Sequence, residues 1–410
     1  MSEWTTIRLG SVVRTNTTSY SPKEGWKYVN YLDTGNITEN VIDAIQNIDL
    51  ANEKLPSRAK RKVQINSILY STVRPNQKHF GIIKSMPENF LVSTGFAVID
   101  IIPDKIDADY LYFWLTQNTV VEQLHAIAEQ SVSAYPSIKA SDIENLEITL
   151  PPLTVQKSIA SILKSISDKM SHNSNINENL QKQANLIFDE LVGQHIPTMN
   201  DSNCSLQLHE IGNLDVLITD YVANGSFKSL ADNVQYLSKE TDNVLIRLTD
   251  YNNNFSSDMV YISDESYNFL SKSKLYGDEI IISNVGANVG TVFRCPRLNK
   301  RMSLAPNAIM LRSAKYEHYL YLYFISHYGQ QQLQSIVTGS AQPKFNKTNF
   351  RSLKVVLPDE TILNKITDMY NPMFEQIVAN LRENKALVEI RDSLLPKLMS
   401  GELEVSGFQF

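Results

Sequence analysis

The sequence predicts two tandem bodies of mixed α/β (α+β) class, joined by two long helices that pair as an antiparallel coiled coil. Two observations predict this architecture. An internal repeat divides the 410 residues into two similar units, and each unit ends in an apolar stripe with a seven-residue period. We expect pseudo-symmetric bodies at 1–150 and 198–357, a central spacer helix at 151–197, a C-terminal spacer helix at 358–404 and a tail at 405–410.

The repeat is clearest where residues 143–192 are laid over 350–399 without a gap. The Leu150-Pro151 step then falls on Leu357-Pro358, and several apolar and asparagine positions coincide. Farther upstream the two bodies match only in short motifs with small gaps between them. Two bodies of one architecture but different surfaces indicate two related tasks directed at different targets.

Both bodies alternate short β-branched runs with turn residues. We expect strands at Ile65–Ser71, Gly95–Ile102, Leu146–Leu150, Val244–Leu248, Glu279–Ser283 and Leu353–Leu357. Aromatic-rich amphipathic helices are expected at Asp109–Ala128 and Tyr316–Val337. A proline that follows each final strand stops the strand and can open the helix that comes next.

The tails carry two apolar rows each, four residues apart. The first tail has Ile159, Ile166, Asn173, Leu180 and Ile187, followed by Leu163, Met170, Asn177, Ala184 and Leu191. The second tail has Ile366, Met373, Asn380, Leu387 and Leu394, with Tyr370, Ile377, Asn384 and Leu398 alongside. Narrow stripes of this kind are typical of a coiled coil, and short connections favour antiparallel partners. The alternative is two separate helices, each packed on its own body.

Four asparagines interrupt these rows near the middle of each tail: Asn173, Asn177, Asn380 and Asn384. An asparagine in a core row costs stability but penalises slipped registers. Our hypothesis is that this polar layer sets the coiled-coil register; in the alternative, these side chains face solvent.

Composition excludes several classes of protein. Lys and Arg number 38 against 44 Asp and Glu, a net charge of -6, so any nucleic-acid binding must be local. Two cysteines cannot form a disulfide scaffold or a four-ligand zinc site, and we expect no metal site. The first residues lack the features of a signal peptide, and no apolar run is long enough to span a membrane. We therefore expect a reduced, cytoplasmic protein.

Cations gather in loops against this acidic background, at 53–62, 294–301 and 344–354, beside side chains that can read base edges. Lysine and arginine neutralise phosphates, arginine suits guanine, and asparagine or glutamine suits adenine. The candidate DNA-binding residues are Arg58, Lys60, Arg61, Lys62, Arg74, Asn76, Lys78, His79, Asn284, Asn288, Arg294, Arg297, Gln342, Lys344, Asn346 and Lys347. The alternative is a set of ordinary solvated charges.

Several segments resemble the specificity (S) subunits of Type I restriction-modification systems. They are the ending Arg391–Leu403, the junctions 150–156 and 357–361, the strand-following Ser71–Asn76, and Gly339–Gln342. The second junction departs from the usual Pro-Pro-Leu-x-x-Gln form. The resemblance covers essentially the whole chain, including its duplicated order.

The resemblance implies that each body is a target-recognition domain for one half of a bipartite DNA sequence. The helices would set the gap and dock two modification subunits, which would use S-adenosylmethionine to methylate adenine N6 on a flipped base. Restriction subunits would add ATP- and Mg-dependent translocation and cleavage. The chain itself would have no catalytic residues and would bind no cofactor. The alternatives are a self-contained DNA methyltransferase or nuclease, and a coiled-coil adaptor that binds only proteins.

Overall fold

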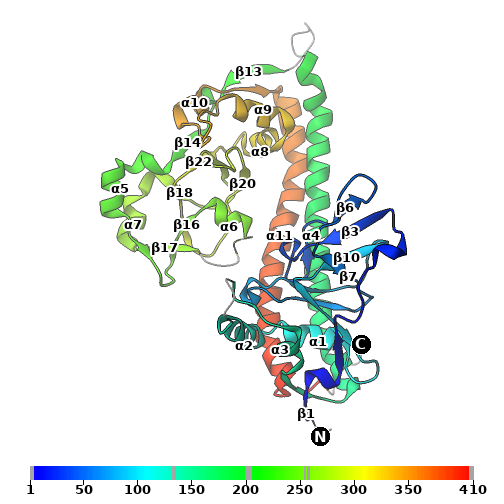
Figure 1. Ribbon diagram of the computed structural model, residues 1–410. Coiled ribbons are helices and arrows are strands. Elements are labelled where there is room, and N and C mark those ends of the chain that lie inside the picture. Colours follow the sequence, from blue (N-terminus) through cyan, green and yellow to red (C-terminus); the bar gives the residue numbers. More distant parts are fainter. Residues whose placement is uncertain (1–3, 132–134, 199–205, 254, 256–258, 406–410) are drawn as a thin grey trace. The chain divides into compact units, whose positions relative to one another are not determined.

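The computed structural model describes residues 4–131, 135–198, 206–253, 255 and 259–405 (Figure 1). It divides into two compact units: unit 1 comprises 1–172 with 383–410, and unit 2 comprises 173–382. Each unit holds one body and a segment of each of two long helices, α4 (Leu153–Leu191) and α11 (Glu360–Ser400). The helices are thus shared between the units and do not form a compact part of their own.

The described part of unit 1 contains two four-stranded sheets. The first has the order β2 (Val13–Thr15), β11 (Phe96–Ile101), β8 (Ile68–Ser71), β9 (Phe80–Ile82). The second has the order β6 (Gln46–Asp49), β3 (Tyr28–Leu32), β10 (Phe90–Ser93), β7 (Ala59–Arg61). Two antiparallel pairs complete it, β1 (Thr5–Arg8) with β12 (Glu147–Leu150) and β4 (Ile37–Thr38) with β5 (Val41–Ile42).

Unit 2 repeats the first sheet and the four strands of the second sheet, with one strand, β15 (Tyr236–Leu237), added at the edge of the second. Its first sheet has the order β14 (Leu217–Asp220), β22 (Ala308–Arg312), β19 (Ile280–Ser283), β20 (Val292–Arg294). Its second has the order β15 (Tyr236–Leu237), β17 (Val260–Ile262), β16 (Asn243–Ile246), β21 (Arg301–Leu304), β18 (Lys274–Leu275). The pair β13 (Gln207–Glu210) with β23 (Lys354–Leu357) matches β1 with β12.

The parallel pair at the centre of each second sheet, β3 with β10 and β16 with β21, is the decisive match. In both units it is flanked by antiparallel neighbours that occur in the same chain order. The predicted duplication and the strands expected from the sequence are therefore confirmed.

Each expected aromatic helix is in fact two helices. Unit 1 has α1 (Ala108–Leu115) and α2 (Asn118–Glu129), and unit 2 has α8 (Glu317–Ile325) and α9 (His327–Ser335). The expectation of single helices is wrong because Gln117 and Ser326 are extended, and the Ser326 hydroxyl caps α9 by accepting from the Gly329 amide.

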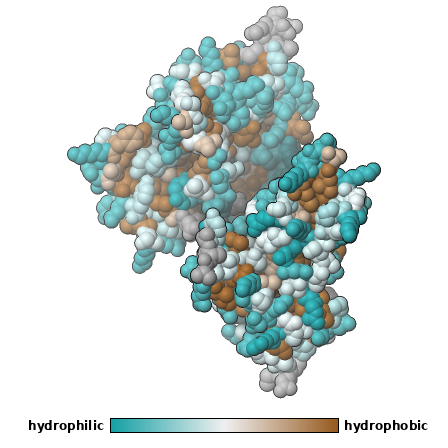
Figure 2. Space-filling view, viewed as in Figure 1, coloured by the Kyte–Doolittle hydropathy of each residue, from teal (hydrophilic) through white to brown (hydrophobic). Residues whose placement is uncertain are grey.

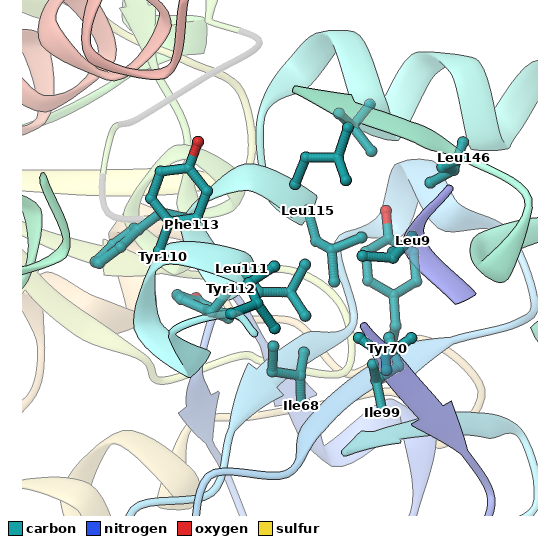
Figure 3. Packing of buried hydrophobic residues seen from close by; sticks show 14 of the residues in the cluster. Leu9, Ile68, Tyr70, Ile99, Tyr110, Leu111, Tyr112, Phe113, Leu115 and Leu146 are labelled. Carbon is teal, nitrogen blue, oxygen red and sulfur yellow. The ribbon is translucent and has the colours of Figure 1, made fainter. Parts of the chain in front are cut away.

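The core of unit 1 lies between its first sheet and α1 (Figure 3). Ile68 and Ile99 from the sheet are fully buried with Leu111 and Leu115 from the helix. Each such side chain stabilises the fold by about 1.5–3 kcal/mol. The end of each long helix extends this core, which is how the bodies are anchored to the helices.

The two long helices pair antiparallel within each unit. In unit 1, Ile159 and Leu163 near the start of α4 share the core with Leu398 near the end of α11. In unit 2, Phe188 near the end of α4 shares the core with Ile366 near the start of α11. Figure 1 shows the helices side by side. The predicted antiparallel pairing is confirmed, and the alternative of a separate helix for each body is wrong.

The asparagines lie where the heptad pattern places them. Asn173 and Asn380 are only 1% and 4% exposed, which excludes a solvent-facing layer for these two. In unit 2 the Asn380 amide donates to Asn177 Oδ1 at 2.7 Å and its oxygen accepts from Gln376 at 2.8 Å. In unit 1, Asn384 donates to the Met170 carbonyl at 3.3 Å.

We predict that Asn380→Leu lowers the free energy of unfolding by about 1–3 kcal/mol, because Asn177 and Gln376 each lose a hydrogen-bond partner. Adding Asn177→Leu should recover most of this loss by making the contact apolar. Urea unfolding of the four proteins of this double-mutant cycle measures the coupling. Strictly additive losses would contradict a specific polar contact.

The first body joins α4 through the side chain of Gln156, which is 2% exposed. Its amide donates to the Pro151 carbonyl and its oxygen accepts from the Asp107 amide, both at 2.9 Å. Asp107 in turn caps α1 by accepting from the Tyr110 amide at 3.0 Å. Glutamine at this position therefore ties the strand end, the long helix and α1 together.

Replacing Gln156 with alanine should cost about 2–4 kcal/mol, because it orphans a buried carbonyl and a buried amide. The expected measurement is a shift in urea midpoint, compared with Gln64→Ala at an exposed glutamine. A shift no larger than the control's would show that water replaces both hydrogen bonds.

Candidate DNA interface

Two loops distant in sequence meet in unit 1. The turn between β8 and β9 contains Arg74, whose amide donates to the Pro136 carbonyl at 2.9 Å. The amide of Ile138 donates to the Thr72 carbonyl at 2.8 Å. The structure thus places the predicted residues Arg74, Asn76, Lys78 and His79 beside the segment 135–138, which precedes α3 (Ala140–Glu144).

Unit 2 contains the same loop pair. The Gly286 amide donates to the Pro343 carbonyl at 2.9 Å, and the Phe345 amide donates to the Asn284 carbonyl at 3.1 Å. The segment after Pro343 leads into α10 (Lys347–Arg351), as the unit 1 segment leads into α3. Arg74 and Gly286 are equivalent because the amide of each donates to the carbonyl of the proline in the opposite loop. The same frame equates Asn76 with Asn288, so this backbone carries an asparagine in both units but an arginine in unit 1 where unit 2 has a glycine.

Arg74 adopts a left-handed backbone with φ 47°. For a residue other than glycine this costs roughly 1–2 kcal/mol, and such strain often marks functional positions. Its guanidinium lies over the ring of Tyr135, 5.1 Å from the centroid, and that ring is 60% exposed. Sequence reasoning missed Tyr135, whose only signal is an aromatic residue before the proline of this loop. Gln342 holds its place in unit 2.

A third turn links these loops to the basic segment 58–62. The Thr94 amide donates to the Arg58 carbonyl and the Thr72 amide donates to the Gly95 carbonyl, both at 2.8 Å. Arg58 and Lys60 are exposed. Arg58 directly precedes β7 and Lys60 lies on it, and one turn connects this strand to the loop that carries Arg74.

Four other candidate residues of unit 1 are paired within the unit or half-buried. Lys62 pairs with Glu24, and Lys78 pairs with Glu39 at 2.9 Å. Arg61 is half-buried, and its burial lowers the pKa of the guanidinium. His79 donates through Nδ1 to the Ile37 carbonyl at 2.7 Å. These four residues support the loops. They can contact DNA only after their present hydrogen bonds, ion pairs or packing contacts are broken.

In unit 2 the exposed candidates are Asn288, Gln342, Lys344 and Asn346. Lys347 pairs with Asp220 at 2.9 Å, and the Asn346 side chain caps α10 by accepting from the Asn349 amide at 2.8 Å. The Asn284 side chain donates to the Phe345 carbonyl at 2.9 Å and so helps to hold the two loops together.

Arg294 has a structural role that differs from the expected DNA contact. Its guanidinium lies 4.4 Å from the Phe374 ring centroid and 4.6 Å from that of Tyr321. It donates to the Asp278 carbonyl at 3.0 Å and to His318 Nδ1 at 3.0 Å. Aromatic residues distant in sequence enclose this cation, so a DNA contact by Arg294 requires the release of these partners, and its assignment to the interface stays a prediction.

Arg297 likewise has partners within unit 2, and its DNA contact also stays a prediction. It forms ion pairs with Asp278 at 2.6 Å and with Glu375 of α11 at 2.7 Å. These acceptors raise the pKa of its guanidinium, with the hydrogen bond to Glu375 as the largest cause. Together with Arg294, it clamps the β20 side of the second body onto α11.

Two titratable groups beside this clamp have opposite pKa shifts. Burial raises the pKa of Glu317 from 4.5 to about 7, and burial lowers the pKa of His318 from 6.5 to about 4. Between pH 7 and 4.5 the folded state takes up the Glu317 proton before the unfolded state, so acid stabilises. Between pH 6.5 and 4 the unfolded state takes up the His318 proton first, so acid destabilises. The two contributions oppose each other.

We predict that Glu317→Gln unmasks the histidine contribution. As the pH is lowered from 7 to 4, the unfolding free energy of this variant should fall below that of the native chain by up to about 3 kcal/mol. Solvent screening makes the difference smaller. Urea unfolding of both proteins across this range measures the difference, and His318→Gln should change in the opposite direction. Parallel pH profiles would contradict the assigned shifts.

An apolar surface patch of unit 2 was also missed by sequence reasoning. A shallow pocket is lined by Tyr221, Leu230 and Val234, together with Phe227 and Tyr236, which are 82% and 55% exposed. Phe227 begins α5 (Phe227–Asn233), and Figure 2 shows hydrophobic colour in that region. Asp220, the partner of Lys347, directly precedes Tyr221, so the patch adjoins the second loop pair.

The comparisons with known proteins agree on one family. Residues 1–182 and 226–384 match the model described as Type I restriction modification DNA specificity domain. The chain is 23% identical to the Type I restriction enzyme HindI specificity subunit of Haemophilus influenzae, over 98% of this chain and 100% of the relative. It is 26% identical to the MjaIX specificity subunit of Methanocaldococcus jannaschii, over 77% of this chain and 73% of the relative.

A solved structure shares the fold. The Type-I restriction-modification system S subunit from M. genitalium aligns with a TM-score of 0.57 at 14% identity, over 97% of this chain and 96% of that one. Within the described residues, every helix is too short or too polar to cross a membrane.

Proposed function

Because the chain belongs to the Type I restriction modification DNA specificity family, we propose that its bodies are target-recognition domains, each reading one half of a bipartite sequence in double-stranded DNA. The duplicated loop pair carries this proposal. One backbone frame presents Arg74 and Tyr135 in unit 1 but Gly286 and Gln342 in unit 2. Because the two loop pairs share a backbone but carry different side chains, the two bodies would read different base sequences. The DNA target would therefore have two different halves.

The long helices would set the spacing between the half-sites. The 39 residues of α4 extend about 58 Å at 1.5 Å per residue, whereas one turn of B-DNA measures about 34–36 Å. A helix of this length can serve half-sites one turn or somewhat more apart. The antiparallel partner α11 and the buried Asn173 and Asn380 would keep that length constant by holding one register.

The chain itself would be non-catalytic and would bind no cofactor. Two modification subunits would supply S-adenosylmethionine and methylate adenine N6, and restriction subunits would supply ATP- and Mg-dependent cleavage in the cytoplasm. Of the apolar residues that lie off the heptad rows of the long helices, Phe188 belongs to the core of unit 2 and is not available for docking. Three apolar side chains of the long helices are exposed: Leu381 at 54%, Ile176 at 44% and Leu186 at 67%. These are better candidates for docking the modification subunits.

Mapping methylated adenines in DNA from cells that contain the chain with its modification subunits tests this function. We expect two specified segments around a fixed gap. Methylation without such a pattern, or none at all, would refute the recognition role.

Two further measurements address the alternatives. Methyl transfer or DNA cleavage by the purified chain alone would favour a self-contained enzyme. An assembled complex that shows no salt-dependent binding to duplex DNA would favour a protein-only adaptor.

A further inference from the structure

We infer that Arg74, stacked on Tyr135, reads a guanine in the half-site of the first body, and that the second body reads its half-site without an arginine at this position. The inference rests on the proposed function and names the base that one of its loops recognises. Both residues lie on the loop pair that the two units share.

Three features suit Arg74 to base reading. Backbone hydrogen bonds fix its position, since its amide donates to the Pro136 carbonyl at 2.9 Å and its carbonyl accepts from the Gln77 amide at 2.9 Å. The aromatic ring beneath the guanidinium orients its plane, 5.1 Å from the centroid. The side chain is exposed, so its edge can reach guanine O6 and N7 as a bidentate donor.

The equivalent residue of unit 2 shows what this backbone position requires. Gly286 has φ 99°, and glycine adopts positive φ without steric cost. Arg74 accepts a left-handed backbone at the same place in the frame. The first body therefore keeps an arginine side chain at a place where the second body has none. In place of the Arg74–Tyr135 pair, the second body presents Gly286 and Gln342, and glutamine is suited to adenine.

A phosphate contact is the competing role for an exposed arginine, and the two roles differ in their consequences. Loss of a phosphate contact weakens binding about equally for all sequences, whereas loss of a bidentate base contact relaxes one position of the target. Discrimination at that position should fall by about 5- to 150-fold.

The test maps adenine methylation by the complete modification complex with variants of this chain. Arg74→Ala and Arg74→Lys should relax one guanine in one half-site and leave the other half-site intact, because lysine keeps the charge but loses the bidentate geometry. Tyr135→Phe should keep the native target and Tyr135→Ala should relax the same guanine. Gln342→Ala should alter the opposite half-site, and Lys23→Ala, at an exposed lysine outside the loops, should alter neither.

The melting temperature distinguishes a base-reading role of Arg74 from a purely structural one. Arg74→Gly should melt at the native temperature or above, because glycine relieves the left-handed backbone, and it should nevertheless relax the guanine. A bipartite native target without guanine in either half, or an unchanged guanine requirement in Arg74→Ala, overturns the inference while the proposed function stands. A native complex that methylates no bipartite target overturns the proposed function instead.

Discussion

Replacing Arg58, Lys60 and Lys344 together with alanine is expected to weaken binding of the assembled complex to cognate and unrelated DNA by roughly 100-fold at low salt. All three side chains are exposed and lie on or beside the loops of the two bodies. Each neutralised phosphate releases condensed counterions, so the slope of log K against log salt should become shallower by about 0.9 per lost contact.

The measurement is a salt titration of binding to one cognate and one scrambled duplex. The matched control replaces Lys23 and Lys239, two exposed lysines outside the basic clusters. If the triple variant and the control have equal slopes, the cations of these loops are ordinary solvated charges. If only the cognate duplex is affected, they read bases and do not contact phosphates.

Arg294→Met is expected to lower the unfolding free energy of unit 2 by about 3–5 kcal/mol, because two part-buried acceptors left without a donor cost about 1–3 kcal/mol each and the cation–π contacts are also lost. The Asp278 carbonyl and His318 Nδ1 lose their donor. The rings of Tyr321 and Phe374 lose a cation–π partner worth about 0.5–2 kcal/mol per contact. Methionine restores only part of the packing.

Chemical unfolding of the full chain, followed separately in the two units by local probes, measures this effect. The control is Arg351→Met, at an exposed arginine of the same unit that donates to the Gly212 carbonyl. A loss below about 1 kcal/mol, as for a surface ion pair, would show that the cluster is not a clamp. The expected functional result is weakened recognition of the second half-site with the first retained.

Elements with a periodic or local signature were predicted well from the sequence. The heptad rows of the tails are buried or half-buried along both long helices. The central strand Ile280–Ser283 of the second body lies within one residue of its predicted range. The division of the aromatic helices escaped prediction because it depends on the single residues Gln117 and Ser326, which the apolar period does not register.

The candidate interface was predicted in part. The turn with Arg74 and the segment with Gln342 were both selected, since each follows or precedes a recognisable strand or helix. Each of them is joined to a second loop by backbone hydrogen bonds, and Tyr135 lies under Arg74. These contacts join residues about sixty positions apart in the sequence. Nothing in the local pattern reports such a contact.

Amino-acid order alone established the duplication and the antiparallel helices, because repeats, hydrophobic period and turn residues are local properties of a chain. Folding in three dimensions decided which charges remain available to a ligand. Arg297 forms an ion pair with Glu375, and aromatic rings enclose Arg294. Arg58 and Arg74 are exposed. The reason is physical: a cation is neutralised by whatever lies within a few ångströms of it, and those neighbours come from distant parts of the sequence.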